Sequence, residues 1–296
     1  MKRTAGDWDS TDKNLYFAAN VPSLMSETAK TTDHLLVAIN EITATYEQKV
    51  DAWIAQGKKV FIDSGVFNLA SEHARAHGVS HNVGLGMAPD DIDGFDALLE
   101  KYCSVLGRIG DRCWGYIEID QGGRDNKIKT RNRLEALGLN PIPVYHPLID
   151  GWDYFDELAS QYDRICIGNL VQASRPVRRR IIRTIWERRR AYPDLWIHLL
   201  GVSPNPVLIS YPMDSCDSST LSSLTRWLQP KGIKTGSFVA LQTGPSVSNA
   251  YAYKPGDGSD GPSGYFKAHQ SGGFSANMIG RTWKSIAGEY ERGGLV

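Results

Sequence analysis

Short apolar runs alternate with longer amphipathic segments along most of this chain. Eight runs rich in β-branched and aromatic residues predict β-strands. They are NLYFAAN (14–20), LLVAIN (35–40), KVFIDSG (59–65), WGYIEID (114–120), PIPVYHP (141–147), RICIGNL (164–170), WIHLLGV (196–202) and YPMDSCD (211–217). Most segments between them carry apolar residues at helical spacing, and several end in glycine, a common helix stop. The predicted helices are 46–57, 69–78, 90–107, 126–138, 152–162 and 176–190.

Eight strands that alternate with helices over about 230 residues are typical of a (β/α)8 TIM barrel, whose usual size is roughly 250 residues. We therefore expect one α/β catalytic domain over residues 1–296, with the barrel at about 14–230 and an extension at about 231–296. Irregular insertions interrupt the pattern, most visibly at 21–34, before the second strand. The extension is predicted to form a Gly/Ser/Pro-rich loop at 253–273 and a closing helix at 274–294.

Composition narrows the class of protein. Hydrophobic residues make up 41% and charged residues 22% of the chain, as in an ordinary globular protein. Lys plus Arg and Asp plus Glu both number 33, so binding to a polyanion requires a local excess of cations. No apolar run approaches the length of a membrane span and the first residues lack a signal-peptide core, so we expect a cytoplasmic protein. The four cysteines lack Cys-x-x-Cys spacing, which favours reduced thiols.

In a TIM barrel the active site is built at the C-terminal ends of the strands. The polar residues and turns at the predicted ends are Asp63, Ser64, Asp120, His146, Gly168, Asn169, Leu170, Gly201 and Asp217. Three carboxylates and a histidine should therefore converge at one mouth. A strand-end aspartate can also simply cap the next helix. Asp63 and Asp120, however, are followed by the glycine-bearing turns SGVF and QGG, which let a ligand approach the backbone closely.

Several of these segments resemble tRNA-guanine transglycosylases. IDSGVF at 62–67 looks like the DSGGF segment of that family, and ICIGNL at 165–170 is similar to its Gly-Gly-Leu turn. HLLGV at 198–202 resembles the strand before the nucleophile loop, and MDSCDSS at 213–219 is similar to the Asp-Met-Phe-Asp-Ser segment. The likeness spans roughly residues 59–225, with the motifs in the same order on successive strands.

The resemblance implies an enzyme that exchanges a guanine base in a nucleic acid for a free 7-deazaguanine base without breaking the strand. By it, Asp217 is the nucleophile, since a carboxylate can hold a covalent glycosyl intermediate. Asp63 is then the acid for the leaving guanine and the base for the incoming deazaguanine. Asp120 accepts hydrogen bonds from the N1–H and exocyclic amine of guanine. The target base must be flipped out of the stack. The expected substrate-binding residues are Ser64, Phe67, Asp120, His146, Gly168, Asn169, Leu170 and Gly201.

The chain departs from the tRNA enzymes at three points. Those enzymes carry a zinc site of three cysteines and a histidine after the nucleophile, but no cysteine follows Cys216, so we expect no zinc and no cofactor. Asn169 replaces the second glycine of the turn, and His146 stands where bacterial enzymes place a glutamine. His146 could read the base, although a lone strand-end histidine is more often structural. The archaeal enzymes also carry an appended RNA-binding domain, which we do not expect here. The chain therefore most resembles phage-type enzymes that insert 7-deazaguanines such as preQ0 into DNA.

Cations concentrate at 174–190, where eight of seventeen residues are arginine. Apolar residues at helical spacing in this segment should pack on the barrel, which leaves Arg178, Arg179 and Arg183 outside as candidate ligands of nucleic-acid phosphates. A solvated helix face is the alternative for any such charge run. Aromatic and basic residues at 265–269 form a second candidate contact with nucleic acid.

Other functions remain open at this stage. The same motifs are compatible with an enzyme that acts on tRNA rather than DNA. A retaining glycoside hydrolase would also use paired carboxylates at the strand ends of a barrel. A barrel without catalytic activity that only binds nucleic acid or a deazapurine is a third alternative, and it would form no covalent adduct.

Overall fold

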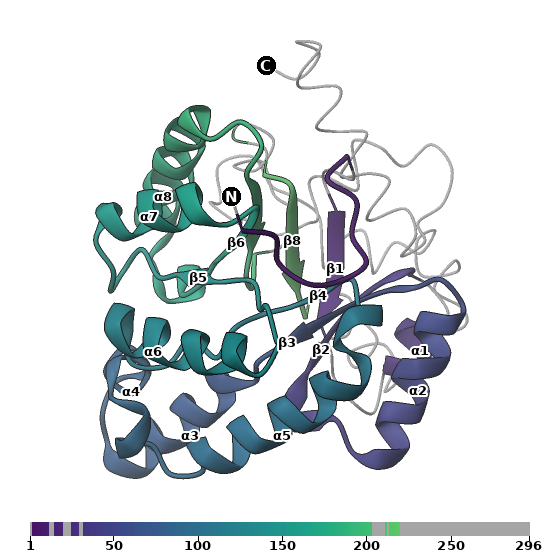
Figure 1. Ribbon diagram of the computed structural model, residues 1–296. Helices are drawn as coiled ribbons and strands as arrows, with labels where there is room; N and C mark the ends of the chain where they lie inside the picture. Colours follow the sequence, from purple (N-terminus) through teal and green to yellow (C-terminus); the bar gives the residue numbers. More distant parts are fainter. Residues whose placement is uncertain are drawn as a thin grey trace, which may run out of the picture.

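The chain folds around one parallel β-sheet with helices on its outer face (Figure 1). The computed structural model describes residues 2–11, 15–19, 25–29, 32–202, 211 and 213–219. The strands are β1 (Leu15–Ala19), β2 (His34–Ala38), β3 (Lys59–Asp63), β4 (Gly115–Tyr116), β5 (Val144–Tyr145), β6 (Arg164–Ile167), β7 (Trp196–Leu199) and β8 (Ser215–Ser218). Their order is β4-β3-β2-β1-β8-β7-β6-β5, and every neighbouring pair is parallel. All eight predicted strands are confirmed.

Helices connect most of these strands. They are α1 (Met25–Thr28), α2 (Ala44–Ala55), α3 (Val66–His77), α4 (His81–Gly86), α5 (Phe95–Ile109), α6 (Gly123–Ala136), α7 (Trp152–Gln161) and α8 (Arg175–Arg188). The six predicted helices are confirmed, and α1 and α4 are additional. Local chemistry sets their starts: the Thr43 side chain accepts from Tyr46 N–H at the start of α2, and Ser80 accepts from Val83 N–H at the start of α4.

The sheet curls strongly, but its pairing does not run fully around a barrel, because β4 and β5 at its two edges do not pair as strands. A single isolated parallel bridge, Ile117 to Ile142, joins the segments next to them. Prolines flank Ile142 on both sides and have no N–H to donate. The Val144 N–H is also taken, since it donates to Glu118 Oε1 (2.6 Å). The expectation of a TIM-like α/β fold is therefore confirmed, whereas the ladder of a closed barrel is incomplete.

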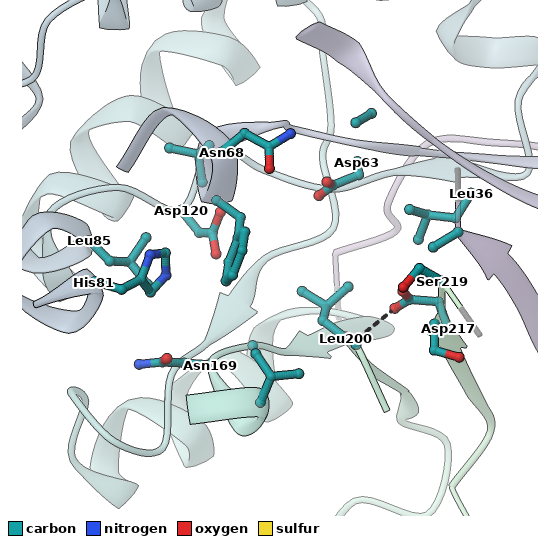
Figure 2. Close-up of a pocket in the computed structure, with 18 of the residues that line it drawn as sticks. Leu36, Asp63, Asn68, His81, Leu85, Asp120, Asn169, Leu200, Asp217 and Ser219 are labelled. Atoms are coloured by element: carbon teal, nitrogen blue, oxygen red, sulfur yellow. Dashed lines mark hydrogen bonds between the residues drawn. The ribbon is translucent and has the colours of Figure 1, made fainter. Parts of the chain in front are cut away.

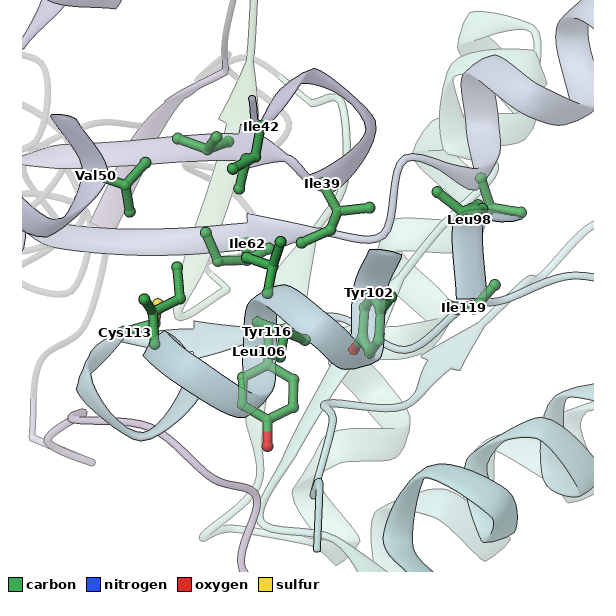
Figure 3. Packing of buried hydrophobic residues seen from close by; sticks show 14 of the residues in the cluster. Ile39, Ile42, Val50, Ile62, Leu98, Tyr102, Leu106, Cys113, Tyr116 and Ile119 are labelled. Carbon is green, nitrogen blue, oxygen red and sulfur yellow. The ribbon is translucent and has the colours of Figure 1, made fainter. Parts of the chain in front are cut away.

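Residue alternation along the strands separates three apolar clusters. The inner face of the curled sheet carries Leu15, Phe17, Leu36, Phe61, Trp114, Ile117, Ile142, Val144, Cys166 and Trp196. On the outer face, one cluster packs β-strands against α7 and α8, and another packs them against α2, α3 and α5. Figure 3 shows part of the second cluster, to which Val50 of α2, Ile62 of β3 and Tyr102 of α5 belong.

The N-terminal segment covers the end of the sheet at which the strands begin. Arg164, the first residue of β6, is fully buried there. Its guanidinium donates to Thr4 Oγ1 (2.8 Å), Trp114 O (3.0 Å) and Ala5 O (2.7 Å). The same group lies 4.3 Å from the ring centroid of Trp8 and 5.0 Å from that of Trp114. This end of the sheet is therefore sealed around Arg164, whose three guanidinium nitrogens all find partners within the protein.

Part of what the sequence predicts lies outside the described residues. This holds for the loop at 253–273, the aromatic and basic residues at 265–269 and the closing helix at 274–294. None of the helices in the described part of the chain is long and apolar enough to cross a membrane.

Candidate active site

A cavity of about 480 Å³ opens at the end of the sheet where the strands finish (Figure 2). Because inward-facing positions recur every second residue, several strands that contribute an apolar side chain to the inner cluster present a cavity residue two positions later. Phe61 is thus followed by Asp63, Val144 by His146, and Cys166 by Gly168. The predicted site residues that line the cavity are Asp63, Phe67, Asp120, His146, Gly168, Asn169, Gly201 and Asp217.

Two expected binding residues lie just behind the cavity wall. Ser64 is buried, and its Oγ donates to Asp120 Oδ1 (3.4 Å). Leu170 is fully buried in the apolar cluster against α7 and α8. Their side chains therefore support the wall and do not form it.

Asp217 is held by two donors at one of its oxygens. Gly201 N–H (3.0 Å) and His198 Nε2 (3.1 Å) both bond to Asp217 Oδ1. His198 Nδ1 lies 2.7 Å from Ser215 Oγ, which also accepts from Trp196 Nε1 (3.1 Å). A hydroxyl that accepts from indole can donate its own proton to His198 Nδ1, and the imidazole then donates from Nε2 to Asp217. This series of hydrogen bonds fixes Asp217 Oδ1 and leaves Asp217 Oδ2 without a donor among the described residues.

Asp214, the other aspartate of the MDSCD segment, has a different environment. It is buried, its Oδ2 accepts from Ile197 N–H (2.7 Å), and Arg189 Nη2 lies 3.2 Å away. Because Asp214 precedes β8 by one residue whereas Asp217 is the third residue of that strand, only Asp217 reaches the cavity. Asp214 serves to join β8 to β7 and to the helix end at Arg189.

Asp63 ends β3 in the cavity wall and is close to the other carboxylates. Burial first, and then the negative charges of Asp120 and Asp217, raise the pKa of Asp63 to about 7, against two backbone N–H groups that lower it. A carboxyl group with this pKa is present in both protonation states near neutral pH. It can therefore give and take a proton there.

Asp120 pairs with His146 across the cavity floor. Burial alone would raise the pKa of Asp120, but the hydrogen bond and charge of His146 outweigh burial and lower it. His146 Nε2 is 2.7 Å from Asp120 Oδ2, and since the ionised carboxylate only accepts, Nε2 donates. Gly168 makes room for this ring, because a Cβ there would lie 2.7 Å from His146 Cδ2. Asp120 is thus kept as a carboxylate that faces the cavity.

A buried cation fixes the backbone of His146. Lys127 on α6 is fully buried, and its Nζ donates to Asp150 Oδ2 (2.5 Å) and to Val144 O (3.0 Å). The same Asp150 oxygen accepts from His146 N–H (2.8 Å). The turn after β5 is therefore held by the Lys127–Asp150 ion pair, which lies behind the cavity. The imidazole of His146 points into the cavity.

His81 on α4 is a cavity residue that the sequence did not indicate. Ser71 Oγ donates to Phe67 O (2.7 Å), so its hydroxyl proton is used, and it must accept from His81 Nδ1 (2.9 Å). Burial lowers the pKa of His81, which favours the neutral ring. Nε2 then carries a lone pair, and it has no hydrogen-bond partner among the described residues. His81 therefore presents an acceptor at the cavity wall, beside the ring of Phe67 (centroids 4.3 Å apart).

The residue after Asp120 explains how α4 reaches the cavity. Gln121 is fully buried, and its Nε2 donates to the carbonyls of Gly84 (2.7 Å), Leu85 (3.1 Å) and Met87 (2.9 Å). These bonds tie the end of α4 to the end of the fourth strand. A lone Gln in the sequence gives no sign of such a role, which is why His81 could be found only in three dimensions.

Further polar atoms at the cavity are buried without a partner. They are His146 Nδ1 and both side-chain polar atoms of Asn169, within the described part of the chain. Asn169 has φ 61°, the left-handed conformation that glycine adopts readily and asparagine tolerates better than most residues. That conformation accounts for asparagine in place of a glycine. Unpaired buried polar atoms are unfavourable, and a cluster of them around one cavity indicates a polar ligand.

The three arginines proposed to bind phosphate have different surroundings. The first turn of α8 lies at the cavity end of the fold, since the helix follows β6. Arg178 Nε donates to Leu170 O (3.0 Å), so this side chain braces the loop after β6. Arg183, one turn further, donates to Glu187 (2.8 Å). Arg179 is exposed on the first turn, where a phosphate could reach it.

No protein-family model matches this chain, and a search of curated proteins found no match either.

Proposed function

We propose that this protein is a base-exchanging transglycosylase that replaces guanine in nucleic acid, DNA in the first instance, by a free 7-deazaguanine such as preQ0. The fold is then a (β/α)8 barrel in which the junction of β4 and β5 is reduced to one bridge. The observation that carries the proposal is the presence of two carboxyl groups at one cavity. One is Asp217, oriented by hydrogen bonds from His198 and Gly201, and the other is Asp63, whose pKa is about 7. A nucleophilic carboxylate beside a proton-exchanging carboxyl group is the pair that this chemistry needs.

In the first half of the reaction, Asp217 Oδ2 attacks C1′ of the target nucleotide. The C1′–N9 bond breaks as the O–C1′ bond forms, and the electron pair of the broken bond goes to the departing guanine. Asp63 in its protonated form gives its proton to that base. In the second half the incoming deazaguanine loses its N9 proton to the Asp63 carboxylate, N9 attacks C1′, and Asp217 is released. Proton transfer by such a group typically contributes about 10²–10⁴ to the rate.

The polar atoms of the cavity support a base as the ligand. Asp120 as a carboxylate and His81 Nε2 are acceptors, and His146 Nδ1 is a further buried polar atom without a partner among the described residues. Guanine and 7-deazaguanines share an edge with an N–H and an exocyclic amino group, which are donors. The cavity volume of about 480 Å³ falls within the usual range for small-molecule sites, about 300–1,000 Å³.

The proposal is tested by incubation of the protein with isotope-labelled preQ0 and three separate substrates: double-stranded DNA, single-stranded DNA and tRNA. The products are digested to nucleosides and analysed by mass spectrometry. We expect the labelled deazanucleoside in DNA and a protein–DNA adduct that survives a denaturing gel. Labelling of tRNA alone would overturn the choice of DNA. Absence of label and of adduct with all three substrates would overturn base exchange.

A further inference from the structure

A second group of potential ligands lies outside the cavity, on the C-terminal half of α3. His73 and His77 are four residues apart, which places them on one face of the helix, and their rings stack with centroids 4.0 Å apart. Asp93, which precedes α5, approaches the same face, with Oδ2 at 3.9 Å from His73 Nδ1. One ligand atom from each of the three residues lies within 4.8 Å of the others.

The ring of His73 is the buried member of this group. The residue is 7% exposed, and neither ring nitrogen has a hydrogen-bond partner among the described residues. An imidazole has two polar nitrogens, and burial of both without a partner is unfavourable. A bound cation would satisfy one of them directly.

A neighbouring carbonyl selects the tautomer of the neutral His77 ring. His77 Nδ1 lies 3.0 Å from His73 O, and a carbonyl only accepts, so Nδ1 carries the proton. Nε2 therefore keeps its lone pair. Metal-binding histidines usually donate their other ring N–H to a carbonyl or carboxylate in this way, which fixes the tautomer and orients the ring.

We propose that His73, His77 and Asp93 bind one divalent transition-metal ion of the zinc class, with water as the fourth ligand. Two imidazoles and one carboxylate suit Zn²⁺, Ni²⁺ or Co²⁺, whereas Mg²⁺ and Ca²⁺ prefer oxygen ligands. Ligands at about 2.1 Å from a tetrahedral ion are about 3.4 Å apart. The separation of 3.9 Å between His73 and Asp93 closes to that value by a small movement of Asp93, whose side chain is 93% exposed.

The ion would act as a clip between α3 and the segment before α5. The first turn of α3 carries Phe67 of the cavity wall, and His73 and His77 lie about 9–15 Å further along the helix axis at about 1.5 Å per residue. The site is thus separate from the carboxylates that would do the chemistry. The site departs from the sequence-based expectation of no zinc, which rested on the absence of a cysteine after Cys216 and of clustered cysteines and histidines, because it joins the two histidines of α3 to an aspartate outside that helix.

Metal binding to the purified full-length chain tests the proposal without any activity assay. The protein is freed of metal with a chelator and titrated with Co²⁺, whose visible absorption reports a four-coordinate site and whose near-ultraviolet spectrum reports thiolate ligands. His77→Gln and Asp93→Asn change exposed ligands, and Asp91→Asn is the matched control, since Asp91 is an exposed acid two residues from Asp93. Zn²⁺ is then added as competitor, and the unfolding temperature is measured with and without Zn²⁺.

We expect the original chain and Asp91→Asn to bind one Co²⁺ without thiolate bands, and to gain a few degrees in unfolding temperature with Zn²⁺. Both ligand variants should bind about tenfold more weakly or worse and lose the thermal shift. Equal affinity of His77→Gln and the original chain would overturn the site. Equal affinity of Asp93→Asn would show that Asp93 is not a ligand and would overturn the three-ligand proposal.

Discussion

The two ends of the strands handle buried polar groups in opposite ways. Where the strands begin, Arg164 is buried between two indole rings, and all three of its nitrogens donate to oxygen atoms of the protein. Where they finish, Asp63 faces two further carboxylates, and His81 and Asn169 keep polar atoms without partners. At the first end the buried charge is fully paired within the chain, and only the indole N–H groups of Trp8 and Trp114 lack a partner among the described residues. At the second end carboxylates and unpaired acceptors surround a cavity, as a polar ligand would require.

Burial shifts a pKa at both ends, but only one of the shifts is useful for chemistry. Burial lowers the pKa of Arg164 to about 9, and the group stays charged at neutral pH. Burial and two neighbouring carboxylates raise the pKa of Asp63 to about 7, so this group changes charge at neutral pH. A perturbed pKa therefore marks a candidate catalytic residue when it coincides with a cavity and unpaired neighbours. It does not do so alone.

The largest expected effect separates Asp217 from Asp214. Asp217→Asn keeps the shape of the side chain but removes the nucleophile, so base exchange should fall by about 10³-fold or more with the fold intact. Asp214→Asn should instead lower the free energy of unfolding, because its contacts hold β8 to β7 and Arg189. Single-turnover adduct formation and urea unfolding, measured on both variants, give the two effects. Ordinary exchange by Asp217→Asn would remove it as the nucleophile.

Asp63→Asn should affect activity and stability in opposite directions. Turnover should fall by about 10²–10⁴, since the variant cannot transfer a proton. Between pH 3.8 and about 7 the unfolded Asp63 is ionised while the folded one holds its proton, so the original chain loses stability as pH rises through this window. The variant lacks this loss and should be more stable above pH 7, by at most about 4 kcal/mol at about 1.36 kcal/mol per pKa unit.

Unfolding curves at several pH values between 4 and 8 check the second half of that prediction. Adduct formation by the original chain should also slow above pH 7, where Asp63 is increasingly ionised. A stability difference that is constant with pH would mean that Asp63 titrates alike in the folded and unfolded states.

The opposite end of the strands should respond in stability alone. Arg164→Leu leaves the oxygens of Thr4, Ala5 and Trp114 without their donor, so the free energy of unfolding should fall by about 3 kcal/mol or more. Arg112→Gln is the control, because its pair with Asp51 is exposed and contributes about 0–1 kcal/mol. Urea unfolding measures both. A large drop in kcat at a temperature where Arg164→Leu is fully folded would contradict the division of roles between the two ends.

The sequence predicts the elements well because each has a clear period. Short apolar runs identify the strands, the eighth of them barely hydrophobic, and the position of active sites in barrels leads from strand ends to Asp63, Asp120 and Asp217. The helix α4 was missed because HNVGLG has two glycines in six residues and no apolar stripe. The incomplete junction of β4 and β5 was missed as well, although the two prolines in PIPV are a visible reason for it.

Two histidines near the site show where sequence reasoning ends. His198 lies in the middle of WIHLL, and its alternation with Trp196 places it on the inner face, so a polar residue at a core position was an available signal. His81 gave no signal, because it reaches the cavity through the bonds of Gln121 to α4, and these join residues 34 or more positions apart. The local periodicity of a sequence carries no information about such long-range contacts.

A smaller effect is expected from the unpaired acceptor at the cavity. His81→Phe keeps an aromatic ring beside Phe67 but removes Nε2, so KM for the free base should rise about 2–10-fold, the value of one hydrogen bond. Ser71→Ala is the comparison, since it removes the partner that selects the tautomer of His81 but leaves the ring and its Nε2 in place, so its effect on KM should be smaller. Initial rates at varied base concentration measure the effect. An unchanged KM in His81→Phe would mean that the base does not contact Nε2.

The smallest expected effect concerns phosphate contacts outside the cavity. Arg179 is exposed near the start of α8, at the cavity end of the strands, whereas Arg183 is paired with Glu187. Arg179→Gln should weaken DNA binding and reduce the slope of log K against log salt by about 1, because one contact releases about one counterion. Arg183→Gln should leave the slope nearly unchanged, and affinity for the free base should not change in either variant. Fluorescence anisotropy at several salt concentrations measures the slopes, and equal slopes for Arg179→Gln and the original chain would make this face of α8 an ordinary solvated surface.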